Sequence, residues 1–305
     1  MNACSNFLSK KIVKLNGGLG NQMFQYAFSI ALGDYWKDEI LFDFSYFKET
    51  AQGNALVRPF ELGVFNTICK PACDEGKQVV DKDNRNLIEK FLWFLRMKKY
   101  KPEKNMIRQK SAYIFEKKFL TQSDIYYYDG YFQNEKYFKH FRKTLLQHFS
   151  LNAENSLDKK NLEISEMIQK TNSVSIHIRR GDYVTLESAN FMHGLCSLDY
   201  YEKAIKYIAK RVKNPHFYVF SDDIDWIQAN LKTNYPNTVI DFNQDRSHFD
   251  LELMKNCKHN ITANSSFSWW AAWLNENPKK IVIAPKNWIA ANQKCDIVPK
   301  RWIKL

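Results

Sequence analysis

Residues 11–32 read KIVKLNGGLGNQMFQYAFSIAL, and this stretch indicates the fold class. Its first five residues are typical of a short strand, which the glycines of 17–20 end in a turn. From Asn21 onward the apolar residues recur at helical spacing, which predicts a helix as far as Leu32. A second apolar run follows at 40–44. Strand, turn, helix and strand in this order predict an α/β sheet.

The second half of the chain repeats this alternation of strands and amphipathic helices. Because the links between them are short, the pattern predicts a parallel sheet with helices on both faces. The expected strands are 174–178, 217–220, 238–242, 259–263 and 280–284, and the expected helices are 198–212, 224–231, 249–257 and 266–275.

A domain boundary is expected where the polar, helical stretch 152–170 ends at Thr171-Asn172-Ser173. The chain is then a two-domain α/β protein, 1–170 and 171–305, with a cleft between the domains. Within the first domain we also expect a helix at 84–99, a strand and turn at 125–132, and a helix at 135–149.

The composition excludes several classes of protein. Apolar residues make up 45% of the 305 residues, and 22 Phe, 16 Tyr and 8 Trp are more aromatic side chains than a disordered chain carries. No apolar run approaches the ~20 residues that span a bilayer. No secretory segment is visible before Lys11, so the six cysteines predict reduced thiols in a cytoplasmic protein.

The net charge of +12 favours an anionic partner such as nucleic acid, an acidic membrane surface or a phosphate-bearing substrate. Part of the excess lies between Arg96 and Lys118, where basic residues alternate with aromatic ones. One interpretation is a solvated helical face that serves solubility. The other is a surface that holds the protein peripherally against anionic lipid at the inner face of the cytoplasmic membrane.

The glycine turn at 17–20 is the first candidate site. At the start of a helix, glycines let backbone N–H groups approach an anion at the positive end of the helix dipole. The turn has neither the dinucleotide fingerprint nor a P-loop, and a purely structural turn is the alternative. Gly18 with the amides of Asn21 and Gln22 could orient a ligand there.

The run His177-Ile178-Arg179-Arg180 gives the second candidate site. Side chains alternate along a strand, so His177 and Arg179 share one face and Arg180 lies on the other. Ligands of open α/β sheets bind at the carboxyl ends of strands, where an arginine can hold a phosphate bidentately. The alternative is an ion pair between Arg180 and Asp182 that fixes the turn, with His177 as an ordinary buried imidazole.

Asn264, Ser265 and Ser266 precede an apolar run that begins at Phe267. A helix start rich in serine offers hydroxyl and N–H groups to a phosphate, and helix capping alone explains one serine.

The pair Asp222-Asp223 follows an expected strand and could either bind a metal or cap the next helix. The sequence contains no spaced carboxylate cage, zinc-protease motif or serine-hydrolase motif, so we expect no metal.

At these residues the sequence resembles the bacterial α-1,2-fucosyltransferases of glycosyltransferase family 11. The shared motifs cover nearly the whole chain in order and spacing. They are GGLGNQMFQYA at 17–27, GYFQ at 130–133, HIRRGDY at 177–183, HG at 193–194, LDYY at 198–201, YVFSDD at 218–223 and NSSFSWW at 264–270.

The resemblance implies a GT-B fold, in which two Rossmann-like domains face a central cleft. The N-terminal domain would mainly bind the acceptor and the C-terminal domain would bind GDP-fucose. The implied reaction is inverting transfer of L-fucose to the 2-hydroxyl of a galactose on an oligosaccharide or lipid-linked glycan, with no metal or other cofactor. Arg179 matches the arginine that holds the β-phosphate, Ser265 and Ser266 match diphosphate contacts, and Asp250 matches an acidic residue that binds guanine.

Departure of GDP builds negative charge on the β-phosphate, and in the absence of a metal a cation must neutralise it. Arg179 suits that task. A base must also take the proton of the attacking hydroxyl. Asp182 is nearest in the motif, Glu187 lies at the offset of a glutamate in distantly related α-1,6 enzymes, and His177 is the third candidate.

Two other functions stay open at this point. A fucosyltransferase of another linkage, α-1,6 or peptide-directed, would share the donor motifs. A basic nucleic-acid-binding protein would explain the net charge, although no nucleic-acid-binding module is visible in the sequence. We therefore expect no nucleic-acid partner.

Overall fold

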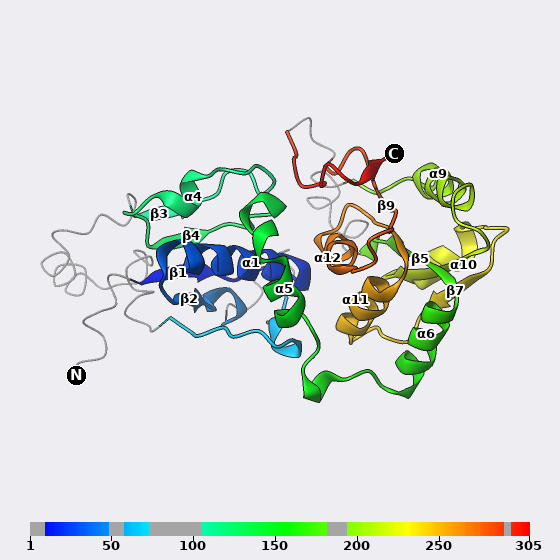
Figure 1. Cartoon of the computed structure of the whole chain (residues 1–305), viewed down its shortest axis with the longest axis horizontal. Coiled ribbons are helices and arrows are strands. Elements are labelled where there is room, and N and C mark those ends of the chain that lie inside the picture. Colours follow the sequence, from blue (N-terminus) through cyan, green and yellow to red (C-terminus); the bar gives the residue numbers. More distant parts are fainter. Residues whose placement is uncertain (1–9, 49–57, 73–104, 182–193, 290–293) are drawn as a thin grey trace, which may run out of the picture. The chain divides into compact units, whose positions relative to one another are not determined.

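The computed structural model describes residues 10–48, 58–72, 105–181, 194–289 and 294–305. The chain divides into two compact units. One consists of Met1–Gly63 and Thr67–His148, and the other of Val64–Asn66 and Phe149–Leu305. Each unit has its own parallel sheet (Figure 1), which confirms the α/β class with two sheet-based halves.

The first unit contains a four-stranded sheet in the order β2-β1-β4-β3, in which every pairing is parallel. Helix α1 (Leu19–Trp36) connects β1 to β2, the crossover that two adjacent parallel strands require. The strands are β1 (Lys11–Lys14), β2 (Ile40–Asp43), β3 (Met106–Arg108) and β4 (Tyr127–Asp129).

Helix α1 carries much of the core of this unit. Met23, Phe24 and Phe28 are fully buried, and the ring of Phe28 stacks on that of Phe132 with 3.9 Å between centroids. The helix ends at Lys37, which adopts the left-handed conformation with φ 52°. The predicted strand–turn–helix unit is confirmed, and the helix is longer than expected.

The prediction of one continuous helix at 135–149 is wrong. Asn134 caps a first short turn, but Phe138 has φ −131° and ψ 3°, outside the helical region, and breaks the run. The chain there forms η4 (Glu135–Tyr137), η5 (Lys139–Phe141) and α5 (Arg142–His148). The other short elements of this unit are η2 (Ser45–Lys48) and α4 (Lys118–Thr121), and η3 (Leu62–Val64) lies where the chain passes into the segment Val64–Asn66 of the second unit. The helix expected at 84–99 lies outside the described residues.

The second unit contains a six-stranded sheet in the order β10-β9-β8-β5-β6-β7, also parallel throughout. The five strands expected from the sequence are confirmed, and β10 is an addition at the edge. The strands are β5 (Asn172–Ile178), β6 (Pro215–Ser221), β7 (Asn237–Ile240), β8 (His259–Ile261), β9 (Val282–Ala284) and β10 (Ile303–Lys304).

Strand β5 lies in the middle of this sheet and has two different faces. Val174, Ile176 and Ile178 belong to the apolar cluster that α9 covers. The alternate residues Ser175 and His177 are also buried, and the Ser175 hydroxyl accepts a hydrogen bond from Asn260 Nδ2 at 2.8 Å. The predicted alternation along this strand is therefore confirmed.

The helices of this unit are α6 (Lys159–Lys170), α9 (Leu198–Ala209), α10 (Ile224–Asn230), α11 (Ser247–Asn256) and α12 (Ser266–Leu274), with the short turn η6 (Ala153–Asn155) before them. The part of helix α12 from Trp269 to Leu274 consists of apolar residues alone, and all of them are buried. Trp269, Trp270 and Trp273 are fully buried within it, and Trp269 Nε1 donates to the carbonyl of Ile297 at 2.9 Å.

The boundary expected at residue 170 differs from the one in the structure, where the chain separates between His148 and Phe149. Helix α6 belongs to the second unit because it packs against α11 and β5. A buried pair of side-chain amides, Asn161 and Asn243, links this helix to the loop before α11 at 2.8 and 3.0 Å. The polar composition of 152–170 reflects the exposed side of a helix and not a linker.

Candidate functional site

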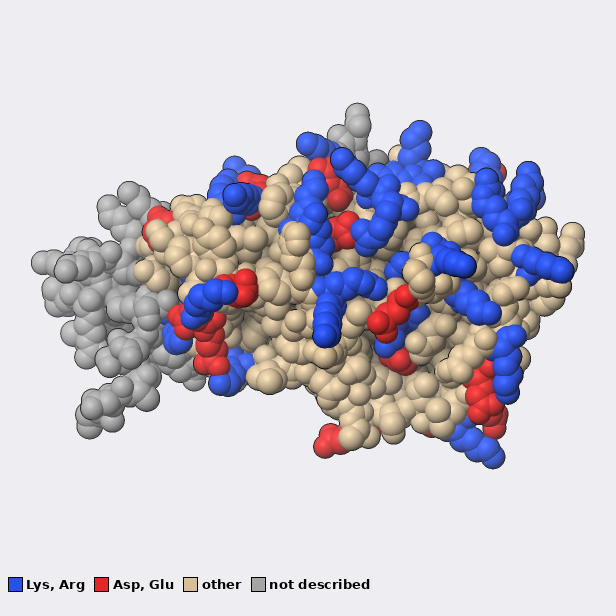
Figure 2. Space-filling model, viewed as in Figure 1, with Lys and Arg blue, Asp and Glu red and all other residues tan. Residues whose placement is uncertain are grey.

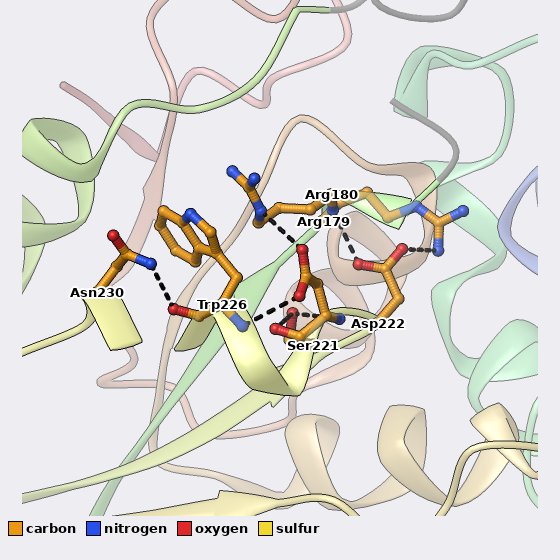
Figure 3. Close-up of polar contacts among 7 residues, drawn as sticks. Arg179, Arg180, Ser221, Asp222, Trp226 and Asn230 are labelled. Atoms are coloured by element: carbon orange, nitrogen blue, oxygen red, sulfur yellow. Dashed lines mark hydrogen bonds and ion pairs between the residues drawn. The ribbon is translucent and has the colours of Figure 1, made fainter. Parts of the chain in front are cut away.

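Two arginines follow β5, and the loop after the neighbouring strand β6 holds both of them (Figure 3). Arg179 Nη1 lies 2.8 Å from Asp222 Oδ2, and the backbone N–H of Arg180 donates to Asp222 Oδ1 at 2.8 Å. Because β5 and β6 are adjacent and parallel, their carboxyl ends meet at one edge of the sheet. Asp222 therefore orients Arg179 at that edge.

Arg180 is held separately. Its Nε lies 3.0 Å from Asp223 Oδ2, and its guanidinium lies 4.1 Å from the ring centroid of Trp226 in a cation–π contact. Asp223 Oδ1 also accepts the N–H of Trp226 at 3.1 Å, which caps α10. The capping role expected for this acidic pair is confirmed for Asp223, and the pairing of both carboxylates with the arginines is an addition that the sequence analysis did not make.

Gly181 leaves room for Asp222 where these residues meet. A Cβ built on this glycine would lie 2.5 Å from Asp222 Oδ2, so the Asp222 side chain would have to shift to accommodate it. Asp182 and Glu187, both proposed as catalytic bases, lie outside the described residues, as does the alternative ion pair of Arg180 with Asp182.

His177 lies on the same strand, and its side chain is buried. Its ring is 5.5 Å from that of Phe267, and within the described part of the chain Nδ1 has no hydrogen-bond partner. Burial lowers the pKa of His177 to about 4, against an opposing effect of Asp222. The imidazole is therefore neutral at pH 7 and able to accept a proton, although weakly basic.

The start of α12 carries the serine-rich segment. The Ser265 hydroxyl accepts the N–H of Phe267 at 3.3 Å and caps the helix, and Ser266 is the first helical residue. Asn264 Nδ2 donates to the carbonyl of Gly194 at 3.0 Å, which ties a distant loop to this helix start. Capping is thus confirmed for Ser265, and phosphate contact by Ser265 and Ser266 stays a prediction.

Asp250 lies in the first turn of α11, where it accepts a hydrogen bond from Asn243 Nδ2 at 2.9 Å. Burial raises the pKa of its carboxyl to about 7. Asn243 is in turn bonded to Asn161, the amide that fixes α6. A carboxyl with its pKa near neutrality is a functional-site candidate on physical grounds.

In the first unit the glycine turn is arranged differently from the expected anion site. Gly17 adopts φ 73°, which favours glycine, and the N–H of Leu19 at the start of α1 donates to Glu61 Oε2 at 2.8 Å. The carboxylate of Glu61 therefore already occupies the positive end of this helix. Nothing in the sequence pattern indicated this contact, because the two residues are 42 positions apart.

Of the other residues proposed at this turn, Gln22 is completely buried and its amide is engaged on both sides. Nε2 donates to the carbonyls of Gly17 and Pro59, each at 2.8 Å, and Oε1 accepts the N–H of Glu61 at 2.9 Å. Gln22 thus fixes the segment 59–61 beside the turn, with Gly18 at the helix start. Asn21 Oδ1 accepts from Gln133 Nε2 at 2.7 Å, which joins two motifs far apart in sequence.

No group of three or more His, Cys, Asp or Glu side chains that could hold a metal occurs among the residues that the structure describes. Over the same residues, no helix is both long enough and apolar enough to cross a bilayer.

The basic stretch at 96–118 is described only from residue 105 onward. There Arg108 pairs with Asp129 at 3.2 Å and Lys118 with Glu116 at 2.7 Å. On the face shown in Figure 2, lysines and arginines are spread out with acidic side chains among them. Contact with anionic lipid stays a prediction.

Comparison with known proteins gives a consistent set of relatives. The family model "Glycosyl transferase family 11" matches residues 82–305. An O-antigen biosynthesis glycosyltransferase of Escherichia coli, WbnK, is 35% identical over 95% of this chain and 99% of its own. An α-1,2-colitosyltransferase of the same species is 34% identical over 98% and 99%. A galactoside 2-α-L-fucosyltransferase of Bos taurus is 28% identical over 48% of this chain and 41% of its own.

Proposed function

Because the chain belongs to glycosyl transferase family 11, we propose that it transfers L-fucose from GDP-fucose to the 2-hydroxyl of a galactose on an oligosaccharide or lipid-linked glycan. Inversion at the anomeric carbon converts the β-linked donor into an α-1,2-linked product. The second unit would bind the nucleotide, and the first unit would bind the acceptor.

The observation that carries this proposal is the position of Arg179. It lies at the carboxyl end of the central strand β5, where ligands of open parallel sheets bind. Its guanidinium has five N–H donors, and the ion pair with Asp222 orients it before any ligand arrives. A preorganised cation of this kind stabilises the charge that develops on the β-phosphate as GDP departs, and no metal is then needed for that step.

The start of α12 would supply a second group of donors to the diphosphate. Its backbone N–H groups carry the positive end of the helix dipole, and Ser265 and Ser266 add hydroxyl groups. Asn264 would hold this segment in place through its bond to Gly194. Arg180, stacked on Trp226, would support Arg179 from the opposite face of the strand.

Asp250 would bind the guanine base. An ionised carboxylate accepts the N1–H and N2–H of guanine together, whereas a protonated carboxyl loses one of these two acceptors. Since the pKa of Asp250 is raised to about 7, its affinity for guanine would change with pH in the neutral range.

The base that deprotonates the acceptor hydroxyl is assigned to Asp182, with Glu187 and His177 as alternatives. Asp182 comes two residues after Arg180 in the sequence, with Gly181 between them. His177 is neutral at pH 7, but its buried position on β5 limits its access to a hydroxyl.

A second donor, GDP-colitose, is supported by the 34% identity to an α-1,2-colitosyltransferase. Colitose is fucose without its 3-hydroxyl, so the two donors differ by one polar group. A site that hydrogen-bonds that hydroxyl rejects the deoxy analogue strongly, whereas an apolar site discriminates weakly.

The test is transfer from each donor to a galactose-terminated oligosaccharide, with the product linkage determined by NMR. The proposal predicts an α-1,2-linked fucose and a higher kcat/KM for GDP-fucose than for GDP-colitose. Transfer from GDP-colitose alone would show that GDP-colitose, and not GDP-fucose, is the donor. Fucose attached to a hydroxyl other than O2 would show that the linkage is not α-1,2.

A further inference from the structure

A chain of hydrogen-bonded side chains links the start of α6 to the start of α11, and the proposed function uses only its last member, Asp250. Its members are Asp158, Asn161, Asn243 and Asp250. At one end Asn161 Nδ2 donates to Asp158 Oδ1 at 2.9 Å, and at the other Asn243 Nδ2 donates to Asp250 Oδ1 at 2.9 Å. Between these ends the two amides exchange a pair of hydrogen bonds at 2.8 and 3.0 Å.

The first member of this chain determines which atoms donate and which accept. The pKa of Asp158 is lowered to about 2, mainly because its carboxylate accepts the backbone N–H of Asn161, so Asp158 is ionised and can only accept. Asn161 must therefore turn its Nδ2 toward Asp158, and its Oδ1 accepts from Asn243 Nδ2. The same nitrogen of Asn243 also reaches Asp250, so Asn243 acts on Asp250 as a donor.

The loop between β7 and α11, which carries Asn243, is held at several points. The carbonyl of Asn243 accepts the N–H of Arg246 at 2.8 Å, which closes a turn before α11. Arg246 Nη1 pairs with Asp158 Oδ2 at 2.7 Å, and α6 packs against α11 (Figure 1). Asn161 and Asn243 are 0% and 3% exposed. The donor directed at Asp250 therefore has little freedom to move.

A purely structural link between α6 and this loop would not require amides. Two apolar side chains of similar shape can replace a buried hydrogen-bonded pair with little change in stability, because they leave no polar group to satisfy. An apolar pair could not supply the N–H that Asn243 donates to Asp250. The contact with this carboxyl is therefore the property that distinguishes the amide pair from an ordinary core contact.

The hydrogen bond from Asn243 opposes the effect of burial on Asp250. Burial raises the pKa of this carboxyl to about 7, and the N–H of Asn243 lowers it, because a donor stabilises the charged form. Burial, followed by the charge of Arg246, lowers the pKa of His248, so this imidazole is largely uncharged where Asp250 titrates. Helix α12, which packs against α11, carries no titratable side chain. Titratable side chains of the other surrounding elements include Asp158 and Lys160 at the start of α6 and Asp245 and Arg246 in the loop.

We infer that Asn243, held in place by Asn161, is a positioning residue that fixes the Asp250 carboxylate for recognition of guanine in preference to other purines. This inference rests on the proposed function, in which Asp250 accepts the N1–H and N2–H of guanine, and it adds the residues that orient that carboxylate. Because Oδ1 receives the N–H of Asn243, this oxygen stays an acceptor, and a proton that binds at lower pH goes to Oδ2. Asn243 acts through Asp250 and not by contact with the nucleotide.

The test is binding of GDP and of IDP to the full-length protein by calorimetry between about pH 6 and about pH 9, since IDP lacks only the 2-amino group of guanine. The wild type should bind GDP roughly 10-fold or more tightly than IDP, because IDP leaves one acceptor of the carboxylate unpaired. Asn243→Leu keeps a similar volume without the N–H and should remove most of this preference. The pH at which GDP affinity is half lost should also rise by roughly one pH unit, because the carboxylate loses a donor.

Asn275→Ala is the matched control. Asn275 is also a buried amide of the second unit, and its Nδ2 donates to Asn260 Oδ1 at 2.8 Å. Its loss should lower the thermal midpoint but leave the ratio of GDP to IDP affinity and the pH midpoint of GDP binding unchanged. If Asn243→Leu does not fold, the double variant Asn161→Leu/Asn243→Leu takes its place, because it leaves neither amide of the pair without its partner.

The outcomes separate this inference from the guanine contact itself. A folded Asn243 variant with the affinity ratio and pH midpoint of the wild type would overturn the inference, as would an equal loss of GDP and IDP affinity at an unchanged pH midpoint, which is the result of a merely structural role. Asp250→Asn should abolish both the preference for GDP and the pH dependence. Wild-type binding of both nucleotides by Asp250→Asn would remove the guanine contact and the inference together, whichever sugar the enzyme transfers.

Discussion

Asp222 binds two consecutive residues of the β5 end at once: Oδ2 lies 2.8 Å from Arg179 Nη1, and Oδ1 accepts the backbone N–H of Arg180 at 2.8 Å. A single carboxylate therefore sets both the side chain of one arginine and the backbone of the next. The direction of the Arg179 guanidinium depends on the loop after β6, so that changes in this loop should affect binding of the nucleotide sugar.

Gly181→Ala tests this dependence without touching either charge. The new Cβ would lie 2.5 Å from Asp222 Oδ2, so Asp222 must move and release Arg179. We expect weaker GDP binding and a fall in kcat/KM of roughly 10-fold or more, because a charged hydrogen bond contributes about 1.5–3 kcal/mol. GDP titration calorimetry measures the first effect.

Asp222→Asn provides the comparison for this substitution. It keeps the shape of the side chain and removes its charge, and the two variants should behave alike. Wild-type GDP affinity in the folded Gly181→Ala protein would show that the position of Asp222 is unimportant.

The pH dependence of donor binding should follow Asp250. With a pKa raised to about 7, its carboxylate is progressively lost as the pH falls through neutrality. The KM for the donor should therefore rise as the pH is lowered from about 8 to about 6. In Asp250→Asn the affinity should be low and independent of pH over this range. A wild-type donor KM that is constant across it would remove Asp250 from the guanine site.

The same carboxyl has an opposite effect on stability. Its pKa is raised by folding, so it stabilises the fold below its ordinary pKa, and this contribution is lost as the pH rises through about 7. As the pH rises, the thermal midpoint of the wild type should therefore fall relative to that of Asp250→Asn. Calorimetry of both proteins at about pH 6 and about pH 8 checks the direction of this change. A difference in thermal midpoint that is the same at both pH values would contradict the raised pKa of Asp250.

The reaction should proceed without a metal. Arg179 and the start of α12 would stabilise the negative charge on the departing diphosphate, as Mn²⁺ or Mg²⁺ does in metal-dependent glycosyltransferases. Turnover should survive excess EDTA followed by dialysis. Loss of activity that Mn²⁺ or Mg²⁺ restores would instead make Asp222 and Asp223 candidates for metal ligands.

The catalytic base is distinguished by comparing Asp182→Asn with Glu187→Gln. Loss of the base should reduce the single-turnover rate by roughly 10²–10⁴-fold while GDP affinity and thermal midpoint stay nearly unchanged. A structural role for Asp182 would instead lower affinity and stability together. A large loss in Glu187→Gln with an active Asp182→Asn would assign the base to Glu187, and wild-type rates in both would leave His177.

The sequence predicted the elements that local pattern controls. The glycines of 17–20, the alternation along β5 and the serine-capped start of α12 all follow from spacing and residue type, and the structure confirms them. The direction of the strands was also predictable, because helices connect successive parallel strands.

Contacts between residues far apart in the sequence could not be predicted from sequence pattern. The carboxylate of Glu61 accepts a hydrogen bond from the start of α1, 42 positions away, and the hydrogen-bonded amides of Asn161 and Asn243 join α6 to the second unit. The pairing of Asp222 and Asp223 with the arginines was within reach, since β5 and β6 were both expected and their ends meet in a parallel sheet. The break at Phe138 has no sequence signal, as neither Gly nor Pro is present there.

Donor turnover by the Arg179→Ala variant tests the central claim most directly. With GDP-fucose and a galactose-terminated acceptor, we expect kcat/KM to fall on the order of 100-fold or more in a protein whose thermal midpoint is retained, because a preorganised charge contact to the leaving group is lost. Arg179→Lys should recover little of the activity, since an ammonium cannot reproduce the bidentate geometry of the guanidinium. Turnover near the wild-type value in folded Arg179→Ala would contradict the assignment of Arg179 as the main contact to the diphosphate.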